Sequence, residues 1–345
     1  IIIIDRRITM KKLLTLISII LYAIVLTACG NDKSGNSYDS KKTVTIKNTY
    51  EFKDKNNTHH RGETKTDTVK VPYNPHRVAV LDYGALDVMK QLGLQNKIVS
   101  IAKGQGNAFL PSSLAEFKDD KYSNLGNPGR PNFDQLAKSK PELILASFRQ
   151  AHTKTIDEMK KAAPNAKILF VSPDHDHYLS SIKSHTSTIG KIFNKENEAN
   201  DLNKKLEQQV TETKKSIKHD SVLFLVVDDK GIKAFSSNGR FGGFLNKDLG
   251  IKHVDKNMKD NSAGNNINYE YLNKVNPDKI FVIDRTKNGT DNKKPSILQN
   301  KVIENVKAIK NHQVYQFESN AWYFGEGGNQ LTIEQLKRIK DAFQK

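Results

Sequence analysis

The chain has 345 residues, and its 55 Lys and Arg outnumber its 38 Asp and Glu, giving a net charge of +17 that is spread along its length. It has no basic stripe with interleaved aromatic residues and no nucleic-acid-binding motif, so the charge does not indicate a nucleic acid partner. Cys29 is the only cysteine, which excludes an intramolecular disulfide and any metal or nucleophile site built on cysteines. About 300 residues follow it, enough for two α/β lobes.

The N-terminus has the pattern of a bacterial secretion signal. Two lysines follow Met10, then comes an apolar run at residues 13–25 and the tetrad Leu-Thr-Ala-Cys that ends at Cys29. The run is shorter than the roughly 20 residues that a membrane span needs. The tetrad resembles the lipobox of bacterial lipoproteins, which implies lipid on the Cys29 thiol and cleavage before it. This pattern divides the N-terminus into upstream translation (1–9), a lipoprotein signal peptide (10–28) and a polar, flexible tether (29–42).

Residues 43–176 are predicted to form a first α/β lobe. Alternating apolar and polar residues predict an edge hairpin with strands at 43–52 and 67–71, with His59 and His60 in the loop between them. Short apolar runs separated by helical stretches predict the rest of the lobe: strands at 77–81, 99–102, 143–146 and 168–171, and a helix at 84–92.

Residues 177–218 are predicted to form a helical linker. Two apolar stripes with helical spacing meet at Asn194, and an unbroken helix over residues 195–218 would be about 36 Å long, enough to cross from one lobe to another. A single rigid strut limits hinging, so we expect the lobes to close by only a few degrees around a ligand. The second lobe, residues 219–345, is predicted to contain strands at 222–227, 279–283 and 313–317 and a C-terminal helix at 331–343.

A thirteen-residue pattern at residues 132–144 returns 136 residues later (268 − 132 = 136). Each copy has a helix-capping Asn, then a carboxylate, Asp134 or Glu270, then a Pro and an apolar strand. The same offset relates Arg149 to Arg285. If helix starts and strand ends share one edge of each sheet, both arginines lie where open α/β sheets bind ligands. The alternative is that the carboxylates only complement helix dipoles and the arginines are solvated.

The lipobox, the two lobes and the crossing helix resemble the substrate-binding proteins that deliver iron siderophores, haem and cobalamin to bacterial ABC importers. Five segments strongly resemble the catecholate siderophore-binding lipoproteins of Gram-positive bacteria: Val-Leu-Asp-Tyr-Gly-Ala-Leu-Asp (80–87), Phe-Lys-Asp-Asp-Lys-Tyr (117–122), Lys-Lys-Ala-Ala-Pro (160–164), Gly-Arg-Phe-Gly-Gly (239–243) and Trp-Tyr-Phe (322–324). The resemblance covers nearly all of the chain after the signal. It implies a class III periplasmic-binding-protein fold, with two Rossmann-like α/β lobes joined by a long crossing α-helix.

The resemblance also implies which residues bind. The ligand-binding candidates are Arg149, Arg240, Arg285, Tyr323, Trp322 and Lys103. Tyr323 matches a tyrosine that ligates the metal directly, while Trp322 would either pack against catechol rings or fill the cleft wall. Asp134 and Glu270 match carboxylates that meet arginines of a permease, one from each lobe.

The chemistry of these residue types fits a ferric catecholate. A ferric tris-catecholate carries three negative charges, and a guanidinium offers a permanent charge with planar donors. One charge pair at about 4 Å is worth roughly 4 kcal/mol at an effective dielectric near 20. We therefore expect Arg149 and Arg285 to act as opposed clamps, with the metal end of the ligand in the second lobe. The Tyr323 phenol, whose reference pKa is about 10, must lose its proton to coordinate iron.

One position departs from the family pattern. Relatives that bind tetradentate catecholates use a histidine as a second iron ligand, and Ala263 stands in its place. Our hypothesis is that this protein relies less on direct ligation and prefers iron complexes that the siderophore already saturates.

The resemblance implies a monomer on the extracellular face of the cytoplasmic membrane of a Gram-positive bacterium, anchored by lipid on Cys29. Its cargo would be a ferric (Fe3+) catecholate siderophore, its partner an ABC permease with a separate ATPase, and it would hold no permanent cofactor. One alternative is a haem-binding lipoprotein of the same class, although three arginines favour catecholate. Another is zinc or manganese transport through His59-His60 or the Asp-His-Asp-His run at 174–177. The chain has no Gly-x-Ser-x-Gly turn and no phosphate loop, so we do not expect an enzyme.

Overall fold

The computed structural model describes residues 42–53, 62–286 and 295–344. The predicted signal peptide, Cys29, all of the tether except its last residue, and the His59-His60 pair therefore lie outside the described residues. Within those residues, none of the helices combines the length and apolar character that a membrane span requires.

The first two strands form the predicted hairpin. Strands β1 (Thr43–Phe52) and β2 (Glu63–Pro72) pair antiparallel, and β2 begins earlier than the alternating pattern indicated. Val44 and Ile46 of β1 are buried, as is Asn48, whose side-chain oxygen accepts a hydrogen bond of 3.0 Å from the backbone N–H of Phe170. This bond attaches the hairpin to the edge strand of the first sheet.

The first sheet has five parallel strands in the order β5-β4-β3-β8-β9. Its central strands are continuous apolar runs buried on both faces, as is typical of parallel sheets. The strands are β3 (Val78–Val80), β4 (Ile98–Ile101), β5 (Ser123–Asn124), β8 (Leu143–Ala146) and β9 (Lys167–Phe170), and the helices are α2 (Tyr83–Gln91), α3 (Phe133–Ser139) and α4 (Thr153–Ala162). A short antiparallel pair, β6 (Gly126–Asn127) and β7 (Arg130–Pro131), precedes α3.

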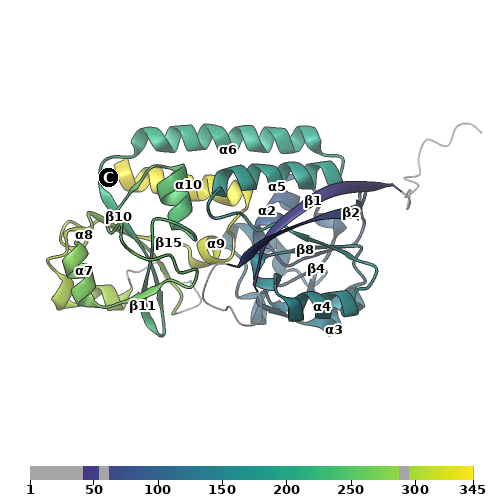
Figure 1. Ribbon diagram of the computed structural model, residues 1–345, viewed down its shortest axis with the longest axis horizontal. Helices are drawn as coiled ribbons and strands as arrows, with labels where there is room; N and C mark the ends of the chain where they lie inside the picture. The colour runs from purple at the N-terminus through teal and green to yellow at the C-terminus, as the bar shows by residue number, and fades with distance from the viewer. Residues whose placement is uncertain (1–41, 54–61, 287–294, 345) are drawn as a thin grey trace, which may run out of the picture. The chain divides into compact units, whose positions relative to one another are not determined.

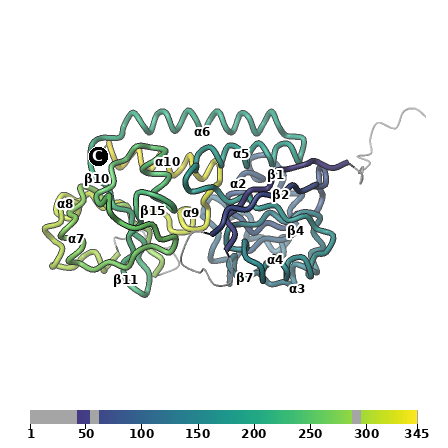
Figure 2. Tube along the Cα trace, in the orientation of Figure 1, coloured from purple at the N-terminus to yellow at the C-terminus, as the bar shows by residue number. Residues whose placement is uncertain are grey.

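Two helices connect the two sheets. The chain leaves β9 through α5 (Tyr178–Ile192), turns at Asn194, which has a φ of 57°, and continues as α6 (Glu196–Ser216). Figure 1 shows α6 at the top of the view, over α5 and α10 (Asn329–Gln344), and the trace in Figure 2 passes from it directly into β10 (Ser221–Asp228). The buried positions of α6 include Ala199, Leu202 and Leu206, the stripe seen in the sequence. The prediction of a long crossing helix is thus confirmed.

The second sheet is mixed. Strands β10, β14 and β15 are parallel, β11 and β13 continue the sheet antiparallel in the order β13-β11-β10-β14-β15, and β12 pairs with β10. Its strands are β10 (Ser221–Asp228), β11 (Gly231–Phe235), β12 (Lys252–His253), β13 (Asn265–Ile267), β14 (Lys279–Asp284) and β15 (Val314–Phe317). Its helices are α7 (Tyr269–Val275), α8 (Lys307–Lys310), α9 (Ser319–Tyr323) and α10 (Asn329–Gln344). Strands β11, β12 and β13 were not foreseen from the sequence.

Shorter turns of helix fill the connections. They are the 3-10 turns η1 (Gln95–Lys97), η2 (Gln105–Asn107), η3 (Ser112–Lys118), η4 (Phe148–Gln150), η6 (Ser296–Gln299) and η7 (Lys301–Ile303), and the π-helical turn η5 (Gly243–Asp248).

The segment between α9 and α10 makes a second link to the first sheet, in addition to α6. One carboxylate oxygen of Asp87 in α2 accepts hydrogen bonds from the backbone N–H groups of Gln330 (2.8 Å) and Leu331 (3.2 Å), which caps α10. Gly84 of α2 lies so close that a Cβ there would stand 2.6 Å from the carbonyl oxygen of Glu326. The expectation of one strut as the sole link is therefore incomplete.

The thirteen-residue repeat folds twice into the same unit. Helices α3 and α7 each span seven residues, and their capping side chains, Asn132 and Asn268, accept hydrogen bonds from backbone N–H groups at 3.0 and 2.9 Å. Each helix ends in a left-handed residue, Lys140 or Asn276, before the chain enters β8 or β14. The local prediction for both copies is confirmed.

Candidate functional site

Arg149 and Arg285 follow the C-terminal ends of equivalent strands. Arg149 lies in η4, just after β8, where the Ser147 hydroxyl accepts a hydrogen bond of 3.1 Å from its backbone N–H. Arg285 follows β14 at once, and its backbone N–H donates to the carbonyl of Val227 (2.8 Å) at the end of neighbouring β10. These hydrogen bonds to the backbone N–H groups fix the backbone position of each arginine.

Arg240 is positioned by a tight glycine-rich turn. A Cβ on Gly242 would lie 1.7 Å from the carbonyl oxygen of Ser236, and one on Gly243 would lie 1.8 Å from that of His175, so neither position accepts a side chain. The approach at Gly243 brings the segment after β9 against the turn that carries Arg240. The Arg240 side chain is buried as a result.

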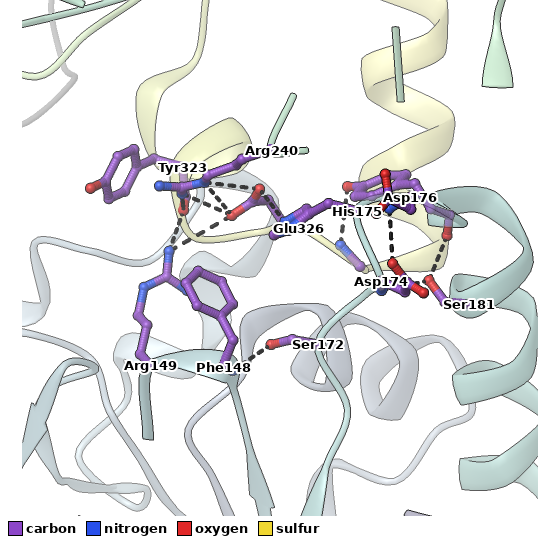
Figure 3. Close-up of polar contacts among 12 residues, drawn as sticks. Phe148, Arg149, Ser172, Asp174, His175, Asp176, Ser181, Arg240, Tyr323 and Glu326 are labelled. Atoms are coloured by element: carbon purple, nitrogen blue, oxygen red, sulfur yellow. Dashed lines mark hydrogen bonds and ion pairs between the residues drawn. The ribbon is translucent and has the colours of Figure 1, made fainter. Parts of the chain in front are cut away.

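The three arginines converge on Tyr323 in α9. The guanidinium carbons lie over its ring, at 3.6 Å from the ring centroid for Arg285, 4.1 Å for Arg240 and 5.7 Å for Arg149. The carbonyl oxygen of Tyr323 also accepts hydrogen bonds from Nη2 of Arg149 (2.6 Å) and of Arg240 (2.7 Å), as Figure 3 shows. Three further rings contact the arginines: Phe148 packs on Arg149, Phe324 on Arg149 and Arg285, and Phe241 on Arg240.

These neighbouring groups change the pKa of the Tyr323 phenol. The charge of Arg240 lowers the pKa of Tyr323, burial opposes that shift, and the charges of Arg149 and Arg285 add to the lowering. In Figure 3 the hydroxyl of Tyr323 points away from Glu326. Three neighbouring cations therefore favour the phenolate, the form in which a tyrosine oxygen can coordinate Fe3+.

Glu326 was missed by the sequence analysis and lies at the centre of the network. Its carboxylate accepts hydrogen bonds from Nε of Arg240 (3.1 Å to each oxygen) and Nη2 of Arg240 (2.8 Å), and lies 3.3 Å from Nε2 of His175 and 3.8 Å from Nη2 of Arg149. Only 4% of its side chain is exposed. The sequence did hold a signal, because Glu326 is a single charge among the glycines of Gly-Glu-Gly-Gly, directly after the Trp-Tyr-Phe segment.

The ion pairs keep the buried Glu326 side chain ionised. Burial alone would raise the pKa of Glu326, but the charge of Arg240 and the hydrogen bonds from His175 and Arg240 outweigh it and hold the pKa at about 2. Burial and the neighbouring charge of Arg240 both lower the pKa of Arg149. With the Tyr323 phenol protonated, three guanidinium groups and one carboxylate leave two positive charges (3 − 1 = 2) at the Tyr323 cluster, meaning Arg149, Arg240, Arg285, Tyr323 and Glu326; deprotonation of the phenol leaves one.

The remaining ligand-binding candidates lie elsewhere. Trp322 is 3% exposed and stacks on Phe317 with ring centroids 4.6 Å apart, inside the hydrophobic core, which corresponds to the wall-filling role. Lys103 is 1% exposed, and its ammonium donates to the carbonyls of Lys118 (3.3 Å) and Asp119 (2.8 Å). These bonds tie Lys103 to the loop after β4, so its ammonium is not among the groups that meet at Tyr323.

A cavity of about 1040 Å³ lies between η2–η3 and the α9–α10 region. Trp322 and Arg338 contribute to its lining, but Arg149, Arg240 and Arg285 do not. The cavity and the Tyr323 cluster are thus two separate features, and the charged side chains converge only in the cluster among these two.

The predicted docking residues and the departing alanine are at the surface. Asp134 and Glu270 are exposed in the first turns of α3 and α7. Ala263 is exposed as well, and its backbone N–H donates to the side chain of Asn261 at 2.9 Å.

The Asp-His-Asp-His run does not form a metal site. His177 pairs with Asp174 (3.0 Å), Asp176 lies 2.5 Å from the ammonium of Lys247, and His175 turns inward to Glu326. Among the described residues, no group of three or more His, Cys, Asp or Glu side chains could hold a metal ion. His175 and Asp176 thus point away from the Asp174–His177 pair, and the described residues give no support to the zinc or manganese alternative at 174–177.

Comparison with known proteins agrees with this architecture. A family model described as periplasmic binding protein matches residues 78–321. The petrobactin-binding protein YclQ of Bacillus subtilis is 34% identical over 97% of this chain and 100% of its own length, and its crystal structure superposes with a TM-score of 0.76 at 33% identity, covering 88% of this chain and all of that one. The ferric-anguibactin-binding protein FatB of Vibrio anguillarum is 30% identical over 77% of this chain and 81% of its own. The catecholate-siderophore binding protein VctP of Vibrio cholerae superposes with a TM-score of 0.70 at 25% identity, covering 87% of this chain and all of its own.

Proposed function

The chain belongs to the periplasmic binding protein family, and we propose that it binds ferric catecholate siderophores, or ferric complexes of small catechols, and delivers them to an ABC permease for iron uptake. The family is one of binding proteins, in keeping with the expectation that the chain is not an enzyme. The observation that carries the proposal is the convergence of three guanidinium groups on one tyrosine ring. The similarity to proteins named for petrobactin and ferric anguibactin supports it.

Each member of the Tyr323 cluster has a role in this proposal. Arg285, Arg149 and Arg240 supply positive charge to an anionic complex, and planar N–H donors suit catecholate oxygens. In complexes that leave a coordination position open, the Tyr323 phenolate would supply a hard oxygen ligand for Fe3+. The rings of Phe148 and Phe324 keep water from the arginine faces, which strengthens their attraction for the ligand.

The arrangement favours catecholate over haem. Haem would need an axial ligand together with a largely apolar cleft, whereas this cluster is dominated by guanidinium groups. The net positive charge of the cluster instead suits an anionic iron complex.

The rest of the transport assignment is also part of the proposal. The protein would be anchored by lipid on Cys29 at the extracellular face of the cytoplasmic membrane and act as a monomer, with lobes at residues 43–176 and 219–345 and a linker at 177–218. Asp134 and Glu270 would each meet an arginine of the permease. Their exposure in two equivalent helices supports this pairing.

A fluorescence titration tests the function. Trp322 is the single tryptophan and adjoins Tyr323, so a ferric catecholate bound at the cluster should quench its emission through its visible charge-transfer band. We expect saturable quenching by ferric catecholates and none by ferric hydroxamates or zinc. Saturable quenching by hydroxamate but not by catecholate complexes would overturn the ligand assignment.

A further inference from the structure

Glu326 places a fixed negative charge inside a site for an anionic ligand. Its backbone is held from two sides: Gly84 of α2 abuts its carbonyl, and a Cβ on the next residue, Gly327, would lie 2.7 Å from Cδ of Pro173. Gly327 has a φ of +90°, which glycine adopts at little cost, and its N–H donates to the hydroxyl of Tyr178 at 3.2 Å. The backbone of Glu326 is therefore fixed, and its carboxylate is held in the Tyr323 cluster by Arg240 and His175.

The carboxylate divides the arginines into two kinds. Arg240 uses Nε and Nη2 for Glu326 and for the Tyr323 carbonyl, and Arg149 uses Nη2 for that carbonyl. The guanidinium of Arg285 makes no hydrogen bond or ion pair with any residue that the structure describes. Within the described ranges, the donors of Arg285 are thus not used by another side chain, while Glu326 holds Arg240 in place.

The carboxylate also sets the charge that a ligand meets. Without Glu326 the three arginines would present three positive charges, and with it they present two. In a partly buried site, each ligand charge that has no opposite charge nearby weakens binding, because the ligand loses hydration without gaining an ion pair. The site therefore matches a complex with two negative charges better than one with three.

We infer that Glu326 sets the charge preference of the site, matching it to ferric complexes with two negative charges. This inference rests on the proposed function and narrows its ligand class. Two catecholates contribute four negative charges, so a third chelating group with one negative charge, such as a hydroxamate, brings a ferric complex to two. Such a complex saturates the iron, in agreement with the hypothesis drawn from Ala263. It leaves no coordination position for Tyr323, which then remains a phenol, so the cluster keeps its two positive charges.

Two synthetic tripodal ligands of equal denticity provide the test. One carries three catecholates, and the other carries two catecholates and one hydroxamate, so their ferric complexes differ by one charge. The dissociation constants of both complexes are measured by Trp322 quenching in the wild type, in Glu326→Gln and in Glu207→Gln. The last variant removes one carboxylate from the exposed face of α6, where Glu207 pairs with Lys183, and serves as the charge-matched control.

The expected result is a change in the ratio of the two dissociation constants. The wild type should bind the mixed complex more tightly, and Glu326→Gln should shift the ratio by about tenfold toward the tris-catecholate complex, since a charge pair weakened by distance and by the exposure of the ligand is worth about that factor. Glu207→Gln should leave the ratio unchanged. An unchanged ratio in folded Glu326→Gln protein, or a wild-type preference for the tris-catecholate complex, would overturn the inference. Failure of the wild type to bind either complex would instead reject the proposed function.

A second comparison avoids leaving a buried charge without its partner. Arg240→Gln combined with Glu326→Gln keeps two arginines and no carboxylate, whereas Arg285→Gln keeps two arginines and the carboxylate. The double variant retains the wild-type net charge of the cluster, so its ratio should stay near the wild-type value. The ratio of Arg285→Gln should lie about tenfold further toward the mixed complex. Equal ratios in the two variants would contradict a charge-setting role for Glu326.

Discussion

Replacing Arg285 with glutamine should weaken ligand binding while leaving the fold intact. Its guanidinium lies 3.6 Å from the Tyr323 ring centroid and has no hydrogen-bonding partner among the described residues. Arg240 differs because it is buried and paired with Glu326. Arg285→Gln therefore tests ligand binding, whereas Arg240→Gln tests the contribution of a buried ion pair to folding stability.

The expected loss of affinity and the expected loss of folding stability follow from the surroundings of each arginine. A charge pair at about 4 Å is worth roughly 4 kcal/mol at an effective dielectric near 20, and partial exposure of Arg285 reduces this to about 1.4–2.8 kcal/mol, or a 10- to 100-fold rise in Kd. Breaking the buried pair in Arg240→Gln should cost about 3–5 kcal/mol of folding stability and lower the Tm by roughly 6–10 °C. We expect Arg285→Gln to change the Tm by less than about 2 °C.

The assay pairs quenching titrations with thermal melts in both variants and in Arg338→Gln. Arg338 is exposed on α10 and lines the 1040 Å³ cavity, so it is a control for the loss of one positive charge outside the Tyr323 cluster. Arg338→Gln should bind like the wild type. If Arg338→Gln loses affinity and Arg285→Gln does not, the ligand occupies that cavity and the reasoning fails.

Four further outcomes are expected. The pKa of Glu326 is about 2 against an ordinary 4.5, so its stabilising contribution is complete above pH 4.5 and disappears as the pH falls toward 2. The stability difference between wild type and Glu326→Gln, on the order of 3 kcal/mol at neutral pH, should therefore narrow across that window in denaturant titrations. Ala263→His should gain affinity for a tetradentate ferric catecholate and not for a hexadentate one; no gain for the tetradentate complex would sink the ligation hypothesis. Gly84→Ala should cost about 1–3 kcal/mol in thermal melts, since its Cβ would lie 2.6 Å from the Glu326 carbonyl oxygen; an unchanged Tm would contradict this. Reversing the charge of Asp134 and Glu270 together should abolish iron uptake by cells while ligand titrations stay normal, and normal uptake would reject their docking role.

The repeated segment is where local sequence and final structure agree best. Capping asparagines, short helices and buried strands depend on neighbouring residues, so both copies folded as predicted and Arg149 and Arg285 followed their strands. The crossing helix α6 was equally predictable from its apolar stripe. Strands β11 and β13 were missed because they are short and mostly polar, and pairing with a buried neighbour decides their conformation.

The sequence alone thus determined the parallel strands of both sheets, the helix between them and the positions of Arg149 and Arg285, since each depends on local periodicity or on the repeat, while the family resemblance pointed to Arg240. Only the tertiary structure decided which of the candidates meet. It directed Trp322 into the core and Lys103 to a loop, and it brought Glu326 between Arg240 and His175 across 86 and 151 residues of chain. No local pattern encodes such contacts, because close glycine packing at Gly84 and Gly243 between distant segments creates them.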